Sequence, residues 1–345
     1  MKWLKEIFLP LGISFIVLGL VLFSESVIPA ATAAISVCIN SVIPSLFPFF
    51  VCSKILLEYG VCEGIGKIIG KPFRNFFRLP EEFAGSFILG CLCGFPTGAR
   101  TCAELYSKNR CTKRQAIVGA VLCNNAGPLF IIGTLGTALL NSAVLGRTLW
   151  FIHLLSAIVT AFILRIFLPP TKPYSVVCTP KKKRSFSEVF TSAVSESVTL
   201  ILQICGIVLF FGAIINVFLR FGMPENGIAI GCIELTSGLI YETKESHRFL
   251  LPIASFLLGF GGLSVFLQVS IFFTPNHIPI LPYIMGKTIQ GGIAATLTCW
   301  YFKCFPITVE TAAINKIQTE QLSALTVISL FLLLVYGCSR RFIQD

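Results

Sequence analysis

The stretch Gly90-Cys-Leu-Cys-Gly-Phe-Pro-Thr-Gly-Ala-Arg-Thr101 breaks a run that otherwise has the composition of a membrane-spanning helix. It places glycines, a proline, threonines and one arginine, Arg100, within a few residues of each other. In a bilayer, irregular backbone is tolerated only where protein or a wet cavity satisfies its polar groups. The stretch therefore predicts an interrupted helix that other parts of the protein enclose.

The overall composition is typical of an integral membrane protein. The 345 residues are 55% hydrophobic and 12% charged, with a mean hydropathy of +0.84, whereas soluble domains carry about 25% charged residues. The formal net charge is +11. Lys and Arg cluster between apolar runs, as in cytoplasmic loops of membrane proteins. We therefore expect a lipid bilayer as a partner and no nucleic acid.

The 14 cysteines do not predict disulfides or a metal site. Most lie inside apolar runs, where cysteine behaves as a small hydrophobic residue. The chain has no C-x-x-C pair, and the spacing of Cys91 and Cys93 is not usual for zinc. His153 and His277 also lack partners at metal-ligand spacing. We expect no metal and no cofactor.

A helix needs about 20 largely apolar residues to cross a bilayer. The segments that meet this requirement are 7–24, 31–57, 115–140, 147–168, 190–220, 249–272, 279–301 and 321–339. Segments 83–106 and 227–243 are apolar but are interrupted by glycine, proline or polar residues. The N-terminal run resembles a signal peptide, but it is longer than a secretory h-region of roughly 7–15 residues. This length favours an uncleaved first helix.

Basic residues indicate which segments cross the membrane. The clusters 67–78 and 108–114 should both be cytoplasmic, which is impossible if the intervening segment 83–106 crosses. We therefore predict that 83–106 is a re-entrant hairpin. With 181–184 and 340–341 also inside, 227–243 becomes a second hairpin that enters from the opposite face. The predicted fold is an all-α polytopic membrane protein with about eight transmembrane helices and two re-entrant hairpins.

The order helix, hairpin, helix occurs twice and predicts an inverted-topology repeat. A short echo supports the repeat, since Leu56-Leu-Glu-Tyr-Gly60 resembles Phe218-Leu-Arg-Phe-Gly222. The predicted organisation is an N-terminal transmembrane helix in 1–30, a first repeat in 31–140, a connecting helix and basic linker in 141–189, a second repeat in 190–272 and C-terminal transmembrane helices in 273–345.

Inverted repeats with helices broken near the membrane midplane are typical of secondary transporters. The N-terminus of a half-helix offers N–H donors and the positive end of its dipole to an anion. The candidate substrate-binding residues of the first repeat are Thr97, Arg100, Asn124 and Asn125. Arg100 could instead snorkel to the headgroups or pair with Glu104, four residues on. The two adjacent amides could instead tie the broken backbone together.

The second repeat supplies candidates of the same kind. They are Thr236, Ser237, Ser264 and Gln268. Ser264 and Gln268 lie four apart on one helix face, while Thr97, Thr236 and Ser237 have a second interpretation as helix caps.

Glu234 is the acid in the apolar part of the second hairpin. A carboxylate at membrane depth is a functional candidate, so Glu234 could couple transport to a proton or sodium ion, or could pair with Arg100. The alternative is that it caps the N-terminus of a half-helix.

Three motifs in these segments resemble a known family. They are Gly94-Phe-Pro-Thr-Gly-Ala99, Asn125-Ala-Gly-Pro-Leu-Phe-Ile-Ile-Gly133 and Gly259-Phe-Gly-Gly-Leu-Ser264. Together they resemble the sporulation integral membrane protein YlbJ (SpoVV) family, which belongs with the nucleoside-recognition or gate domain proteins. The resemblance implies a fold similar to concentrative nucleoside transporters. It also implies a protein of the outer forespore membrane that carries dipicolinate toward the spore.

The leading functional hypothesis is a membrane transporter of a small aromatic dicarboxylate, with dipicolinate as the expected substrate. A nucleoside or another small organic anion is the alternative substrate, and a non-transporting sporulation membrane scaffold is the alternative function. A scaffold should carry sizeable soluble segments, which this chain lacks. The chain has no H-E-x-x-H, G-x-S-x-G or P-loop motif, so we do not expect an enzyme. A homo-oligomer is left open.

Overall fold

The computed structural model describes residues 2–170, 184–244 and 247–305, and within these ranges the chain is helical without a strand. The first part contains α1 (Lys2–Leu22), α2 (Ser24–Val37), η1 (Cys38–Val42), α3 (Ile43–Glu58), α4 (Val61–Ile69), α5 (Lys71–Phe77), α6 (Phe83–Cys93), α7 (Thr97–Ser107), α8 (Lys113–Cys123), η2 (Leu129–Leu139), α9 (Ala143–Leu164) and η3 (Arg165–Phe167). The second part contains α10 (Phe186–Arg220), α11 (Gly227–Ile233), α12 (Leu235–Glu242), α13 (Leu250–Phe260), α14 (Gly262–Phe273), η4 (Thr274–Asn276) and α15 (Ile280–Cys304). The predicted all-α fold is confirmed.

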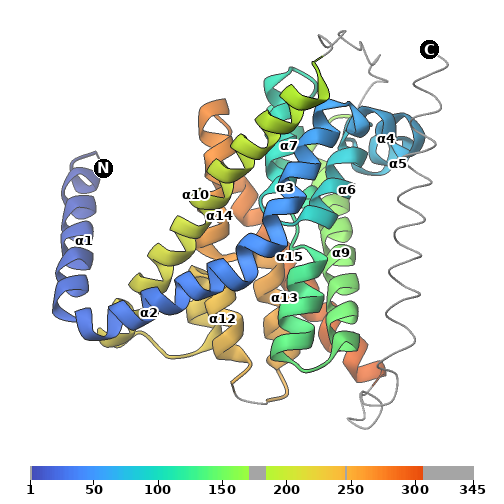
Figure 1. The fold of residues 1–345 in the computed structure, drawn as a ribbon. Helices are drawn as coiled ribbons and strands as arrows, with labels where there is room; N and C mark the ends of the chain where they lie inside the picture. Colours follow the sequence, from blue (N-terminus) through green and yellow to red (C-terminus); the bar gives the residue numbers. More distant parts are fainter. Residues whose placement is uncertain (1, 171–183, 245–246, 306–345) are drawn as a thin grey trace.

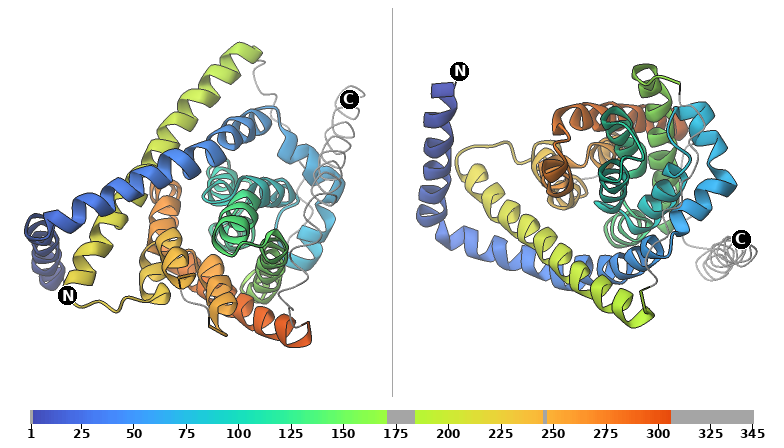
Figure 2. Two further views of the ribbon diagram at one scale, coloured as in Figure 1. Left: turned by 60° about the horizontal axis from the view of Figure 1, so that its bottom comes forward. Right: turned by 90° about the horizontal axis from the view of Figure 1, so that it is seen from above.

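Two long oblique helices run alongside a compact bundle (Figures 1 and 2). One is α2, η1 and α3, which follow one another almost without interruption, and the other is α10, which packs against α2 and α3. The bundle contains α6 to α9 and α11 to α15, with α4 and α5 beside it. The long pair therefore forms a frame against which the broken helices of the bundle lie.

The helix α1 stands apart from this bundle and is held by aromatic contacts. The pair α1 and α2 is bent by 97° where the two helices join. The rings of Phe15 and Phe23 lie 4.4 and 5.2 Å from the ring of Phe221, at the end of α10. The outward side of α1 exposes large apolar residues such as Leu11 and Val21, as expected for a helix in lipid.

Three described helical segments are long and apolar enough to cross a membrane, or up to four if the bent pair counts as one span. The three are Ala143–Phe167, Phe186–Arg220 and Leu250–Asn276, and they coincide with the predicted spans 147–168, 190–220 and 249–272. The predicted span 115–140 is divided at 124–128 into α8 and η2. The segment 321–339 lies outside the described residues. The number of about eight crossings stays a prediction.

The helices α6 and α7 form a hairpin at the predicted position. Arg110, just after α7, is salt-bridged to Glu82, just before α6, so the open ends of the pair meet. The helices are separated at Gly94, whose φ of +78° favours glycine, and the Phe95–Pro96 peptide that follows is cis. Near this tip, the backbones of α6 and α7 approach closely at Gly90 and Gly98.

The helices α11 and α12 form the second hairpin. Gly227, at the start of α11, touches Glu242 at the end of α12, and Gly231 lies against Gly238. Each hairpin thus uses small residues to bring two short helices together. That both are re-entrant in a bilayer, and that the second copy is inverted, stay predictions.

Each hairpin is followed by a broken helix. After the first hairpin, α8 ends at Cys123 and η2, a wide π-type helix, begins at Leu129. After the second, α13 and α14 are separated by Gly261 and Gly262, with φ of +89° and +81°. A side chain at Gly262 would meet the backbone oxygen of Gly231 at 2.6 Å. In both halves, therefore, the break of a long helix lies against the tip of the preceding hairpin.

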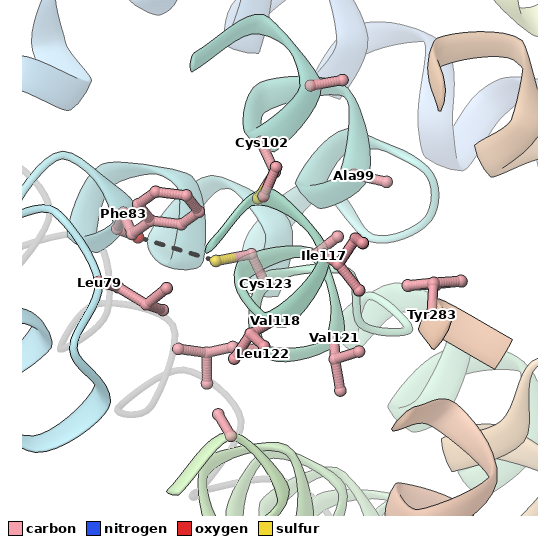
Figure 3. Close-up of a cluster of buried hydrophobic side chains, with 14 of the residues drawn as sticks. Leu79, Phe83, Ala99, Cys102, Ile117, Val118, Val121, Leu122, Cys123 and Tyr283 are labelled. Atoms are coloured by element: carbon pink, nitrogen blue, oxygen red, sulfur yellow. Dashed lines mark hydrogen bonds between the residues drawn. The ribbon is translucent and has the colours of Figure 1, made fainter. Parts of the chain in front are cut away.

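The largest apolar core gathers around α8 (Figure 3). Phe83 from α6, Cys102 from α7, Cys123 from α8 and Tyr283 from α15 all point into it, and each is buried. The Cys123 thiol donates weakly to the Phe83 carbonyl at 3.8 Å. Cysteine is used here as a small core residue. Across the described residues, no group of His, Cys, Asp and Glu side chains has the arrangement of a metal site.

Candidate functional site

The break between α8 and η2 lies at the centre of a buried polar network. The side chain of Asn124 is fully buried. Its Oδ1 accepts from the Ala99 N–H at 3.3 Å, and its Nδ2 donates to the Tyr283 hydroxyl at 2.8 Å. Ala99 is in the first turn of α7, so Asn124 occupies part of a half-helix N-terminus that the sequence assigns to a substrate anion.

The neighbouring residues complete the support of the broken backbone. Asn125, also fully buried, donates to the Leu122 carbonyl at 2.7 Å. The Ala126 N–H donates to His153 Nε2 at 3.1 Å, so His153 on α9 accepts at this nitrogen and secures the backbone next to the break. In this conformation the amides of Asn124 and Asn125 tie the broken backbone together. Their contact with substrate stays a prediction.

The network also contains a fully buried lysine, Lys287 of α15, with an exposed fraction of 0%. Its Nζ donates to the backbone oxygen of Asn124 at 2.9 Å and to Gln290 Oε1 at 2.6 Å. Gln290 Nε2 in turn donates to Asn125 Oδ1 at 3.2 Å. One turn of α15 thus binds both asparagines of the break.

The tip of the first hairpin covers this lysine. The ring centroid of Phe95 lies 5.4 Å from Lys287 Nζ, within the range of a cation–π interaction. Phe95 also packs against two of the apolar core clusters. The hairpin tip, the helix break and α15 therefore meet at a single cation.

The charge of Lys287 is not balanced by a nearby acid. Among the described residues, no carboxylate forms an ion pair with it. An ammonium group has three N–H donors. The Asn124 carbonyl and Gln290 Oε1 accept two of these hydrogen bonds. Removing an ion from water costs several kcal/mol unless it is paired. An ionisable side chain in this position is a functional candidate in a membrane protein.

Arg100 lies apart from this network and is paired with an acid that the sequence did not indicate. Its Nη2 contacts Glu196 Oε2 of α10 at 2.7 Å. The alternative pairings with Glu104 and Glu234 are not the ones formed, since Glu104 binds Lys108 and Glu234 caps α12. The expected role of Arg100 toward a substrate carboxylate stays a prediction.

Glu234 is the N-cap of α12. Its two carboxylate oxygens accept from the N–H groups of Thr236 at 2.9 Å and Ser237 at 2.6 Å. A negative side chain at this position satisfies free donors and complements the helix dipole. In this conformation Glu234 therefore caps α12. Its role in ion coupling stays a prediction. The side chains of Thr236 and Ser237 are half-buried beside it.

Ser264 and Gln268 lie buried on α14. This helix contacts both α7 and α11, so it connects the candidate residues of the two halves. Tyr283 links it to the polar network, because its ring packs edge-on against Phe266 with centroids 6.1 Å apart. Thr97, the first residue of α7, is buried, and its Oγ1 has no hydrogen-bond partner among the described residues.

Sequence reasoning missed Lys287, Gln290, Tyr283 and Glu196. One signal was present for Lys287, since it is the charged residue within the predicted span 279–301, and such residues are functional candidates. Tyr283 and Gln290 belong to no recognisable motif. Their role follows only from the packing of α15 against α8 and α13.

The helices, their buried break points and the apolar spans define an all-helical integral membrane protein. Comparison with known proteins agrees with this class. The chain is 27% identical over 316 residues to the sporulation integral membrane protein YlbJ of Bacillus subtilis (strain 168), covering 79% of this chain and 77% of that protein. No family model and no solved structure matches. This similarity agrees with the resemblance to the YlbJ family that the three sequence motifs indicate.

Proposed function

We propose that this protein is a membrane transporter of a small aromatic dicarboxylate, dipicolinate, during spore formation. The observation that carries the proposal is Lys287, a buried cation without an acidic partner among the described residues, at the point where a helix break meets a hairpin tip. A transporter of anions needs a positive charge that is free to take a substrate carboxylate. The YlbJ relationship supplies the sporulation context.

The chemistry of the surrounding groups suits this substrate. Dipicolinate is a flat aromatic dianion, so it combines carboxylates with a ring face. The remaining N–H donor of Lys287 would take one carboxylate oxygen through a charge-assisted hydrogen bond. The amides of Asn125 and Gln290 lie within the same network. The ring of Phe95 lies over the ammonium group of Lys287. The aromatic ring of the substrate would lie against the same ammonium group in a similar way.

Transport through this site requires movement, because Lys287 is completely enclosed. We assign this conformation to an occluded state. In the proposed mechanism, the hairpin tip with Phe95 withdraws from Lys287 to admit substrate. The proposal includes two re-entrant hairpins, an inverted repeat of the gate type similar to concentrative nucleoside transporters, and a location in the outer forespore membrane. Broken helices at the substrate site are the feature on which such repeats rely.

The test is uptake of labelled dipicolinate and of labelled uridine into proteoliposomes that contain only this protein. We expect saturable uptake of dipicolinate that unlabelled dipicolinate competes away, and little uptake of uridine. Uptake of uridine without dipicolinate would assign a nucleoside substrate. Uptake of neither, from liposomes with correctly folded protein, would refute transport and favour a scaffold.

A further inference from the structure

A second group of charged residues lies where α3, α7 and α10 meet. Lys54 of α3 and Arg100 of α7 both contact Glu196 of α10. Lys54 Nζ lies 3.0 Å and Arg100 Nη2 lies 2.7 Å from the same carboxylate oxygen, Glu196 Oε2. The other oxygen accepts from the Ser192 hydroxyl at 3.3 Å. Two cations thus converge on one carboxylate oxygen.

The cations and the carboxylate differ in how far the protein covers them. The side chains of Lys54 and Arg100 are 12% and 14% exposed, whereas that of Glu196 is 42% exposed. The cations are therefore built into the protein body, while the carboxylate approaches them from the outer side. Another carboxylate can reach the same two groups if Glu196 swings away, because the Glu196 side chain is less covered by protein than either cation.

The position of Arg100 connects this group to the proposed transport path. Arg100 lies one turn after Thr97, the first residue of α7, and its N–H donates to the Pro96 carbonyl at the hairpin tip. Phe95, which covers Lys287, precedes this proline. An anion held at Arg100 would therefore lie one helical turn from the hairpin tip that has to move. A guanidinium group is also well suited to a carboxylate, which it can bind through two parallel hydrogen bonds.

We propose that Lys54 and Arg100 form an entry site for an organic carboxylate, which Glu196 occupies as an internal ligand when no substrate is present. The site deepens the proposed transport function and rests on it for the identity of the anion. Substrate binding exchanges one carboxylate for another at the same cations. Glu196 thereby lowers the affinity for substrate. A second acid, Glu58, stays beside Lys54, with its Oε1 3.4 Å from the Lys54 Nζ.

The test measures the reactivity of Arg100 toward phenylglyoxal, an arginine-specific reagent, by mass spectrometry of its peptide. In Glu196→Gln we expect Arg100 to react faster by up to about fivefold, since partly exposed ion pairs contribute about 0.2–1 kcal/mol. Dipicolinate or phthalate should slow this reaction, and uridine should not. Glu188→Gln, which removes an exposed acid from the same helix, should react like the parent, and Glu196→Asp should be intermediate.

Arg100 reactivity in Glu196→Gln that equals the parent rate, or that carboxylates do not slow, overturns the entry site. This result is independent of transport. If proteoliposomes fail to take up dipicolinate but carboxylates still protect Arg100, the proposed substrate is wrong and the entry site stands. If uptake occurs, the KM of Glu196→Gln should fall by up to about fivefold. An unchanged or higher KM in a folded variant refutes the internal-ligand role.

Discussion

Lys287 Nζ donates to the backbone oxygen of Asn124 at 2.9 Å and so joins the middle of α15 to the point where α8 stops. A helix that ends inside a protein leaves carbonyl groups without intrahelical partners. Here a buried ammonium group satisfies one of them. The transport proposal rests on the same group, which has no acidic partner in the described part of the chain. Its structural and functional roles therefore have to be separated by experiment.

Lys287→Met should separate the two roles. The substitution keeps an unbranched side chain and removes the cost of holding an ion without an acidic partner away from water. We expect the free energy of unfolding to stay within about 2 kcal/mol of the parent, because this gain offsets the loss of a donor by two buried acceptors. Affinity for dipicolinate should fall roughly 10- to 100-fold, because a hydrogen bond between charged groups is lost. Lys303→Met, at the exposed end of α15, is the control. Normal dipicolinate uptake by Lys287→Met would make Lys287 purely structural.

Gly98→Ala should be destabilising. A methyl group at this position would overlap the carbonyl of Cys123, and overpacking costs about 1–3 kcal/mol. Gly292→Ala is the matched control, because nothing lies within 4 Å of its added carbon. That variant should gain up to about 1 kcal/mol from helix propensity. Thermal unfolding in detergent compares the two, and equal midpoints would show that α7 does not lie against the break.

Glu234→Gln tests capping against ion coupling. The variant keeps one acceptor oxygen and loses the charge at the N-terminus of α12, so we expect it to be less stable by about 0.5–2 kcal/mol. Any response of dipicolinate uptake to an imposed pH gradient should be the same as in the parent. The exposed Glu225→Gln should change neither property. A stable Glu234→Gln protein that exchanges dipicolinate but ignores the gradient would instead make Glu234 the proton carrier.

The topology is testable by cysteine labelling in a background without the exposed Cys52, Cys299 and Cys304. Asn75→Cys and Ser107→Cys, exposed positions that flank the first hairpin, should react with an impermeant maleimide from the same side of the membrane.

For the second hairpin, the exposed positions Glu225→Cys and Lys244→Cys should both react from the opposite side. Labelling of Asn75→Cys and Ser107→Cys from different sides would mean that the first hairpin crosses the bilayer. The inverted repeat would then be wrong as well.

The breaks in the helices were predictable because they depend on the residue types at the break itself. Gly94 and Pro96 interrupt the first hairpin, and the run from Asn124 to Pro128 interrupts the helix that follows it. Glycine permits positive φ, and proline lacks the N–H that a helix needs. Such residues act on their own backbone, so their effect can be read without knowledge of the fold.

The partners of the charged residues were not predictable for the opposite reason. Arg100 and Glu196 are 96 residues apart in the chain, and nothing near either residue indicates the other. Spacing suggested Glu104, four residues away on the same helix, but Glu104 binds Lys108. The choice depends on how α10 packs against α3 and near α7, which is a property of the tertiary structure.

The contact between Phe15 and Phe221 has a consequence for how the protein is made. The helix α1 leaves the ribosome long before the end of α10 exists, so it lacks its aromatic partner when it enters the bilayer. At roughly 5–20 residues per second, the delay is on the order of 10–40 seconds. During this interval lipid has to stabilise α1 alone, and its largely apolar sequence with Leu11 and Val21 on the outward side meets that requirement.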